Sequence, residues 1–257
     1  MKFVKKKLAL VLALCLTLSL IAPMGAGAVT KRTNTGFADI RDSETAVAVE
    51  VLRMMGAVDG YGDGSFRPET PLTRAQFCKM AVLVMNKGDQ AAQYKNYTIF
   101  PDVKSSHWAA GFINLAVKGE QIPAAGEDKP ATVKRGIISG FADGTFGPDR
   151  TITYAQAVTI LVRMLGYEDA EVGGVWPESY MTVGATSGLT TGITAELGAP
   201  VTRGLAARLF ASLLATNIKG SETTYGASVA KTVVSGVLLS STATASDGSP
   251  NALKLSN

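Results

Sequence analysis

The chain has 257 residues, with 25 Lys and Arg against 21 Asp and Glu, and therefore a formal net charge of +4. Four basic residues lie within the first seven positions, so the remainder is formally neutral. It has no basic stripe that could bind nucleic acid or an anionic membrane. A single His and two Cys are too few for a zinc site of the usual Cys/His composition. The sequence therefore predicts neither a metal nor a cofactor.

The first 28 residues have the pattern of a secretory signal peptide. A cationic start precedes an apolar stretch over residues 8–22, which is too short for a membrane span, and Ala26-Gly27-Ala28 is a small-residue cleavage signal. A lipoprotein signal would use Cys15, but this residue interrupts the apolar run instead of ending it. We expect cleavage after Ala28, a secreted chain without a membrane anchor, and no disulfide, because only Cys78 is left.

An internal repeat dominates the rest of the chain. Residues 60–77 and 140–157 are identical at eight of 18 positions without a gap, against about one expected from average composition. A third, more eroded copy is visible at 201–204, which aligns with 72–75 and 152–155. Duplication of one structural unit is the reading that such periodicity favours.

Each copy predicts a helix that begins after a Thr and carries an apolar stripe at i, i+3, i+4 and i+7. Gln76 and Gln156 follow their Thr residues by three positions, which is the spacing of a capping box. Asp-Gly pairs at 63–64 and 143–144 predict turns upstream. The three stripes are Phe77, Met80, Ala81 and Val84; Ala157, Ile160, Leu161 and Met164; and Ala206, Leu209, Phe210 and Leu213.

An outer helix is also predicted near the start of each copy, the third one running through Ala185 and Leu189. Asp39 and Asp102 precede the first two of these helices and are predicted as capping or turn residues. The predicted organisation is a leader at 1–28, a first repeat at 29–88, a second at 98–168 with a surface insertion at about 122–135, a third at 169–217, and a linker or short β-prone tail at 218–257, which is alternatively the start of a further domain.

These residues resemble the S-layer homology domain family. Its pattern is an opening Phe-x-Asp, a Trp before the first helix, Gly-Tyr-x-Asp-Gly-Thr-Phe-x-Pro, and an Ile-Thr-Arg-Ala-Glu helix start. The last element reads Leu-Thr-Arg-Ala-Gln at 72–76, Ile-Thr-Tyr-Ala-Gln at 152–156 and Val-Thr-Arg-Gly-Leu at 201–205. The resemblance covers about residues 37–216.

The resemblance implies an all-α fold in which three helix-loop-helix repeats form a pseudo-threefold spindle around a central three-helix bundle. It also implies that grooves between repeats bind secondary cell-wall polysaccharide through a pyruvate-ketal amino sugar, at the bacterial cell surface. A guanidinium fork suits the ketal carboxylate and an aromatic face suits a sugar ring. The implied ligand-binding residues are Arg74, Arg203, Trp108, Trp176, Tyr61, Asp63, Phe141, Asp143, Tyr154 and Arg150.

The sequence departs from the family pattern in each copy. Tyr154 replaces the second Arg, with Arg150 nearby, while the first copy lacks its Trp and the third lacks the Asp-Gly turn. We therefore expect one or two competent grooves, each composed of parts from neighbouring repeats. One alternative is a surface-layer subunit that self-associates, and another is the targeting module of a wall-active enzyme. No paired catalytic carboxylates, Gly-x-Ser-x-Gly or metal-ligand cluster occur in residues 29–257, so catalysis is not predicted.

Overall fold

The computed structural model describes residues 36–122, 132–134 and 136–230. The predicted leader and the tail beyond residue 230 lie outside this part of the chain. The regular elements of the described residues are helices, as predicted, apart from one short antiparallel pair of strands, β1 (Glu120–Ile122) and β2 (Thr132–Lys134). This pair forms the two sides of the insertion in the second repeat. None of the described helices is long and apolar enough to cross a membrane.

Three inner helices begin at the positions that the Thr residues predict. They are α3 (Arg74–Val84), α5 (Tyr154–Met164) and α8 (Arg203–Ala215). Thr73 and Thr153 form capping boxes with Gln76 and Gln156, and Thr202 accepts a hydrogen bond from the Leu205 amide. All residues of the three predicted stripes are buried, so the predicted core is confirmed.

Three outer helices complete the repeats: α2 (Ser43–Met54), α4 (Ala110–Lys118) and α7 (Glu178–Thr186). A 3-10 helix, η1 (Gly88–Tyr94), joins the first repeat to the second, and a short helix, α6 (Asp169–Val172), opens the third. Helix α7 ends before Leu189, which is three residues short of the predicted helix, because Gly188 takes a φ of +86° that ends the helical turn.

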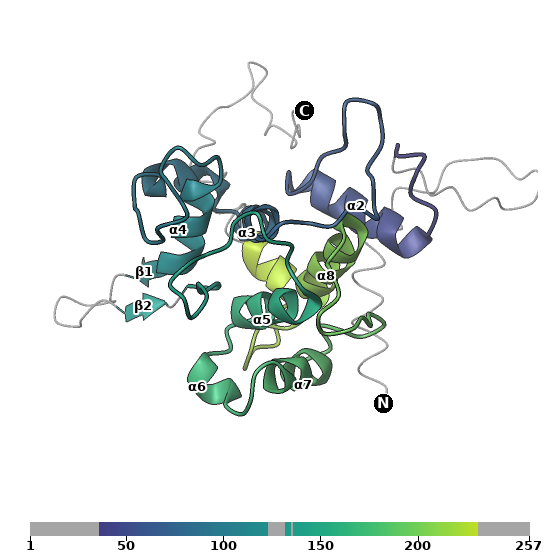
Figure 1. The fold of residues 1–257 in the computed structure, drawn as a ribbon. Coiled ribbons are helices and arrows are strands. Elements are labelled where there is room, and N and C mark those ends of the chain that lie inside the picture. The colour runs from purple at the N-terminus through teal and green to yellow at the C-terminus, as the bar shows by residue number, and fades with distance from the viewer. Residues whose placement is uncertain (1–35, 123–131, 135, 231–257) are drawn as a thin grey trace, which may run out of the picture. The chain divides into compact units, whose positions relative to one another are not determined.

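Each outer helix packs on the inner helix of the preceding repeat. Helix α4 contacts α3, α7 contacts α5, and α2 contacts α8, while α8 touches both other inner helices. Figure 1 shows α3, α5 and α8 centrally, with α2, α4 and α7 around them. The three repeats therefore interlock in a cycle, and none of them buries its own apolar faces alone. The spindle arrangement itself stays a prediction.

A closed ring of backbone hydrogen bonds joins the segments that precede the inner helices. The Leu72 amide donates to the Val201 carbonyl (2.9 Å), Val201 to Ile152 (3.0 Å), and Ile152 back to Leu72 (3.0 Å). The first amides of each inner helix are also satisfied by the next repeat in the cycle, since Arg74 donates to the carbonyl of Arg150 (2.9 Å). Helix starts, which otherwise leave amides unpaired, are thus used to join the repeats.

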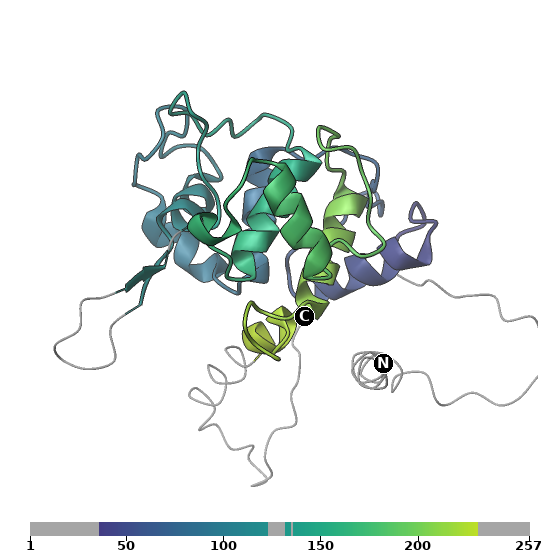
Figure 2. The same cartoon turned by 90° about the horizontal axis from the view of Figure 1, so that it is seen from below.

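The chain does not leave the repeats as a linker after residue 217. Tyr225 donates its amide to the Thr216 carbonyl (2.8 Å), Lys219 donates to Leu165 (2.9 Å), and residues 225–230 are helical. The Tyr225 ring is buried, with 8% of the residue exposed. Figure 2 shows this last, yellow-green part of the described chain turning back beside the helices. Residues 218–230 are therefore part of the folded unit, and only the remainder of the predicted β-prone tail lies outside the described residues.

Candidate functional site: the contacts between repeats

Arg74 projects from the start of α3 onto the Asp-Gly loop of the second repeat. Its Nε donates to the Phe146 carbonyl (2.9 Å), and its terminal nitrogens donate to the Ser139 carbonyl (3.2 Å) and to Gln156 Oε1 (3.2 Å). The residue is 4% exposed. Burial lowers the pKa of Arg74 to about 10, so the guanidinium stays charged at neutral pH. This side chain holds two repeats together.

Arg203 makes the equivalent contact between the third repeat and the first. Its Nε donates to the Phe66 carbonyl (2.8 Å) and a terminal nitrogen donates to the Asp59 carbonyl (2.7 Å). Its guanidinium lies 4.4 Å from the centre of the Phe66 ring and 5.1 Å from that of Tyr61. Burial lowers the pKa of Arg203 as well. Arg203 is half-buried and therefore more open to solvent than Arg74.

Tyr154 occupies the same position at the contact between the second and third repeats. Its hydroxyl donates to the Ile193 carbonyl (3.1 Å), the residue is 2% exposed, and burial raises the pKa of the phenol. Tyr154 thus reaches a carbonyl of the next repeat, as the two arginines do, but it carries no charge. Direct ligand contact by Arg74, Arg203 and Tyr154 stays a prediction, but the structure gives all three a role in joining repeats.

Two further guanidinium groups lie at the outer side of these contacts. Arg67 lies 3.9 Å from the centre of the Tyr61 ring, and Arg150 lies 4.9 Å from that of Phe141. Both arginines are exposed. Sequence reasoning missed Arg67, although its position four residues after Asp63 was a signal for the ion pair that the two residues form (2.7 Å). Asp143 accepts from the Thr145 amide (2.9 Å), as a turn residue should.

The two tryptophans are half-exposed but are held in different ways. Trp176 is 53% exposed and its Nε1 donates to Thr159 Oγ1 (3.0 Å), which anchors the ring on α5. Trp108 is 55% exposed and stacks with His107 at 5.6 Å between ring centres. His107 Nε2 in turn lies 4.0 Å from Asp149 Oδ1. Both tryptophans therefore keep about half of their surface exposed.

Asp39 and Asp102 lie in turns as predicted, but neither caps a helix, because Asp42 caps α2 and Ala109 precedes α4. The Asp102 carboxylate instead accepts from the amides of Phe146 (3.0 Å) and Gly147 (2.7 Å). Asp39 makes the same pair of bonds to residues 66 and 67. These carboxylates hold the Phe-x-Pro segments in place, a role that sequence spacing did not show.

The Asp102 contact predicts an acid-dependent loss of stability. Burial acts to raise the pKa of Asp102, but the two amides outweigh it and hold the pKa below the usual range. A lowered folded-state pKa stabilises the protein above the unfolded pKa of about 3.9, and this stabilisation is lost as the pH falls through the folded value. We expect Asp102→Asn to cost about 1 kcal/mol at pH 7, because the new amide nitrogen faces a backbone donor.

Urea unfolding at pH 7 and at pH 3 checks this expectation. The difference in free energy of unfolding between wild type and Asp102→Asn should be smaller at pH 3 than at pH 7. Glu69→Gln, at an exposed carboxylate, should have the wild-type free energy of unfolding at both pH values. A gap of equal size at the two pH values would show that the carboxylate charge contributes nothing.

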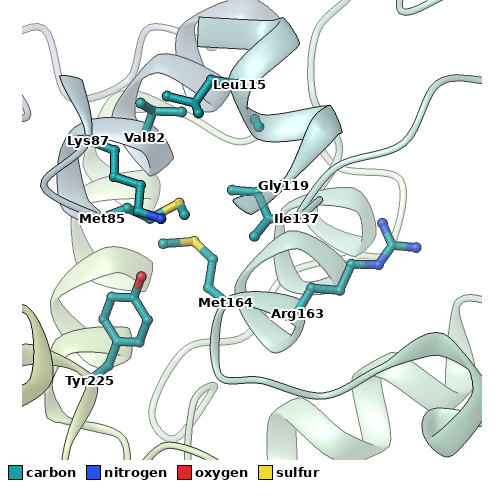
Figure 3. Close-up of a pocket in the computed structure, with 10 residues that line it drawn as sticks. Val82, Met85, Lys87, Leu115, Gly119, Ile137, Arg163, Met164 and Tyr225 are labelled. Carbon is teal, nitrogen blue, oxygen red and sulfur yellow. The ribbon is translucent and has the colours of Figure 1, made fainter. Parts of the chain in front are cut away.

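A small pocket lies elsewhere, where α3, α4 and α5 meet the segment after α8. Its walls are mainly apolar, with Lys87 and Tyr225 supplying polar ends, and Figure 3 shows the guanidinium of Arg163 pointing away from it. Burial raises the pKa of Tyr225 well above its ordinary value. None of the predicted ligand-binding residues lines this pocket, so it is no part of the contacts described above.

Comparison with known proteins identifies the class to which this arrangement belongs. The described part of the chain contains no cluster of three or more His, Cys, Asp or Glu that could hold a metal. The S-layer homology domain model matches residues 36–78 and 131–158. The chain therefore carries S-layer homology domains, as the resemblance predicted. The matched residues cover parts of the first two repeats, and the third continues the same pattern of contacts.

The chain is similar to larger bacterial proteins. It is 37% identical over 202 residues to the "Middle cell wall protein" of Brevibacillus brevis, covering 78% of this chain and 17% of that protein. It is 36% identical over 194 residues to the "Surface layer protein" of Brevibacillus choshinensis, covering 75% of this chain and 15% of that protein. An "Exoglucanase XynX" of Acetivibrio thermocellus is 26% identical over 201 residues, covering 72% of this chain and 16% of the enzyme.

The chain thus spans a small fraction of the length of these relatives. The family and the first two relatives support a secreted, cell-wall-associated location. The first two are named for the cell wall and surface layer, whereas the third is an enzyme.

Proposed function

We propose that this chain anchors a surface protein non-covalently to the cell wall by binding secondary cell-wall polysaccharide at the contacts between its repeats. The observation that carries the proposal is the pair of Asp-Gly loops, each covered by two guanidinium groups over one aromatic ring. A guanidinium binds a carboxylate through charge-assisted hydrogen bonds, and an exposed indole offers a face to a sugar ring. The family match supports the same role.

The ligand that suits such a site is a polysaccharide whose amino sugars carry pyruvate ketals. A ketal-linked pyruvate places one carboxylate on a neutral sugar ring, which matches one guanidinium beside one aromatic face. Anchoring without catalysis is the activity that we propose for these repeats.

Isolated wall polysaccharide, with its ketals intact or removed by mild acid, tests this proposal. The full chain should bind the intact polymer, and binding should weaken with added salt because it depends on charge. Equal binding of both polymers would overturn the carboxylate part of the proposal. A neutral, unketalised wall glycan of similar length serves as the control for non-specific adsorption.

Assembly into a surface layer is the second candidate, favoured by the "Surface layer protein" relative. In that case the repeats anchor the chain and other parts of it self-associate. Sedimentation velocity over a range of concentrations separates the two candidate functions. An anchoring module alone should keep one sedimentation coefficient, whereas a self-associating chain should sediment faster as the concentration rises.

A further inference from the structure

The two Asp-Gly loops have matching backbone hydrogen bonds, but they differ in whether the exposed arginine of the loop is paired with a carboxylate. In each loop one aromatic ring lies under an inner guanidinium from the preceding repeat in the cycle, buried in Arg74 and half-buried in Arg203, and under an exposed one from the loop itself. The pairs are Arg203 and Arg67 over Tyr61, and Arg74 and Arg150 over Phe141. Because the inner cations are bound to carbonyls, the outer ones are the charges that a ligand can reach.

Arg67 is already occupied by a carboxylate of its own loop. A terminal nitrogen of Arg67 lies 2.7 Å from Asp63 Oδ2, and its Nε donates to Ser65 Oγ (3.2 Å). The backbone of Arg67 has a φ of +59°, which is unfavourable for a residue with a side chain, whereas the second loop has Gly147 at this place with a φ of +67°. The first loop therefore has an unfavourable backbone conformation at Arg67, the residue whose side chain pairs with Asp63.

Arg150 has no such partner. Among the residues that the structure describes, no carboxylate forms an ion pair with its guanidinium. Asp143 bonds to Thr145 and interacts with Arg150 only electrostatically, over a longer distance, and Asp149 lies beside His107. Its backbone is nevertheless fixed, since its amide donates to Gly147 (3.1 Å) and its carbonyl accepts from Arg74 (2.9 Å). Arg150 is thus an exposed cation on a rigid loop, which lowers the entropy cost of binding an anion.

An aromatic platform lies near the residue that precedes Arg150 in the second loop. Asp149, the residue before Arg150, lies 4.0 Å from His107, and the His107 ring stacks with the half-exposed Trp108. The first repeat has no Trp at the corresponding place, and the contact made by Tyr154 offers no guanidinium from that position. The three contacts therefore differ in chemistry although they share a fold.

We propose that the contact between the first and second repeats is the open ligand site, where Arg150 binds the carboxylate of an acidic saccharide and Trp108 contacts its ring. At the contact between the third and first repeats, Asp63 occupies Arg67 in place of a ligand carboxylate and closes the site. This inference rests on the proposed function and specifies which residues perform it. In this inference Arg150, and neither Arg74 nor Arg203, is the cation that binds the ligand carboxylate.

Calorimetric titration of the full chain with the methyl glycoside of a pyruvyl-ketal N-acetylamino sugar tests this assignment. Wild type should bind one molecule per chain. Arg150→Gln should weaken binding about tenfold or more, because a charged hydrogen-bonding partner is lost. Asp63→Asn should add a second binding site, because Asn keeps the oxygen that accepts from Ser65 but no longer neutralises Arg67. Asp143→Asn is the matched control in the other loop and should keep one site.

The outcomes separate this inference from the proposed function. Unchanged binding by Arg150→Gln, or a single site in Asp63→Asn, would overturn the inference while the function stands. Equal binding by wild type of the ketal glycoside and of the same sugar without the ketal would instead overturn the proposed carboxylate ligand. Loss of the added site in the double variant Asp63→Asn with Arg67→Gln would support the assignment of the second site to Arg67.

Discussion

Arg74→Ala should lower the free energy of unfolding by about 3 kcal/mol, the largest effect that we expect from any charged residue of this protein. The substitution leaves the carbonyls of Phe146 and Ser139 without their donor and removes the group packed against Phe141. Phe146 is a buried residue, and a buried acceptor left unpaired loses its hydration without compensation. Arg74→Lys should not restore stability, because one ammonium group cannot replace the fork that reaches all three acceptors.

Thermal and urea unfolding of Arg74→Ala beside Arg150→Ala measures this difference. Arg150 contacts the same Phe141 ring from an exposed position, so its substitution should change the stability by no more than about 0.5 kcal/mol. If Arg74→Ala kept the wild-type unfolding midpoint and lost only glycan binding, Arg74 would be a ligand residue and its role in joining the repeats would be refuted.

Tyr225→Ala should destabilise the protein by about 3 kcal/mol, an effect that a residue of a linker would not have. The ring forms one side of the pocket, whose other walls come from residues of α3, α4 and α5 and so from the first two repeats. Gly226 beside it lies so close to α8 that an added Cβ would be 2.9 Å from the Leu214 carbonyl. Removing the ring would enlarge the pocket and open it to water.

The matched variant Tyr225→Phe keeps the ring and should stay within about 1 kcal/mol of wild type. Hydrogen exchange provides a second readout, since the amide of Tyr225 is bonded to Thr216 and should exchange slowly in wild type and faster in Tyr225→Ala. Wild-type stability of Tyr225→Ala would mean that the segment after α8 contributes nothing to the folded unit.

The helices of this fold were predictable because their signals are local. Thr73 and Gln76 lie three residues apart, and the stripe from Phe77 to Val84 repeats at helical spacing, so a short window of sequence contains the whole argument. The Asp-Gly turns are local in the same sense. The strands that border the insertion were not predicted, because their pairing joins residues 120 and 134, which lie at opposite ends of the insertion.

The partners of the site residues were not predictable, because they lie far apart in the sequence. Arg74 bonds to a carbonyl 72 residues away, and Arg203 bonds to one 137 residues away. A motif shows that an Arg recurs at one position but not which acceptors its donors will find. The role of Tyr225 was hidden for the same reason: it follows a segment rich in Ser, Thr and Gly, whose composition favours a linker.

Co-sedimentation of the full chain with purified cell walls, before and after the secondary polysaccharide is stripped from them, tests the proposed anchoring most directly. We predict that the chain pellets with intact walls, stays in the supernatant with stripped walls, and is displaced from intact walls by the released polysaccharide. Equal pelleting with intact and stripped walls would contradict the account, because the chain would then be bound to peptidoglycan itself.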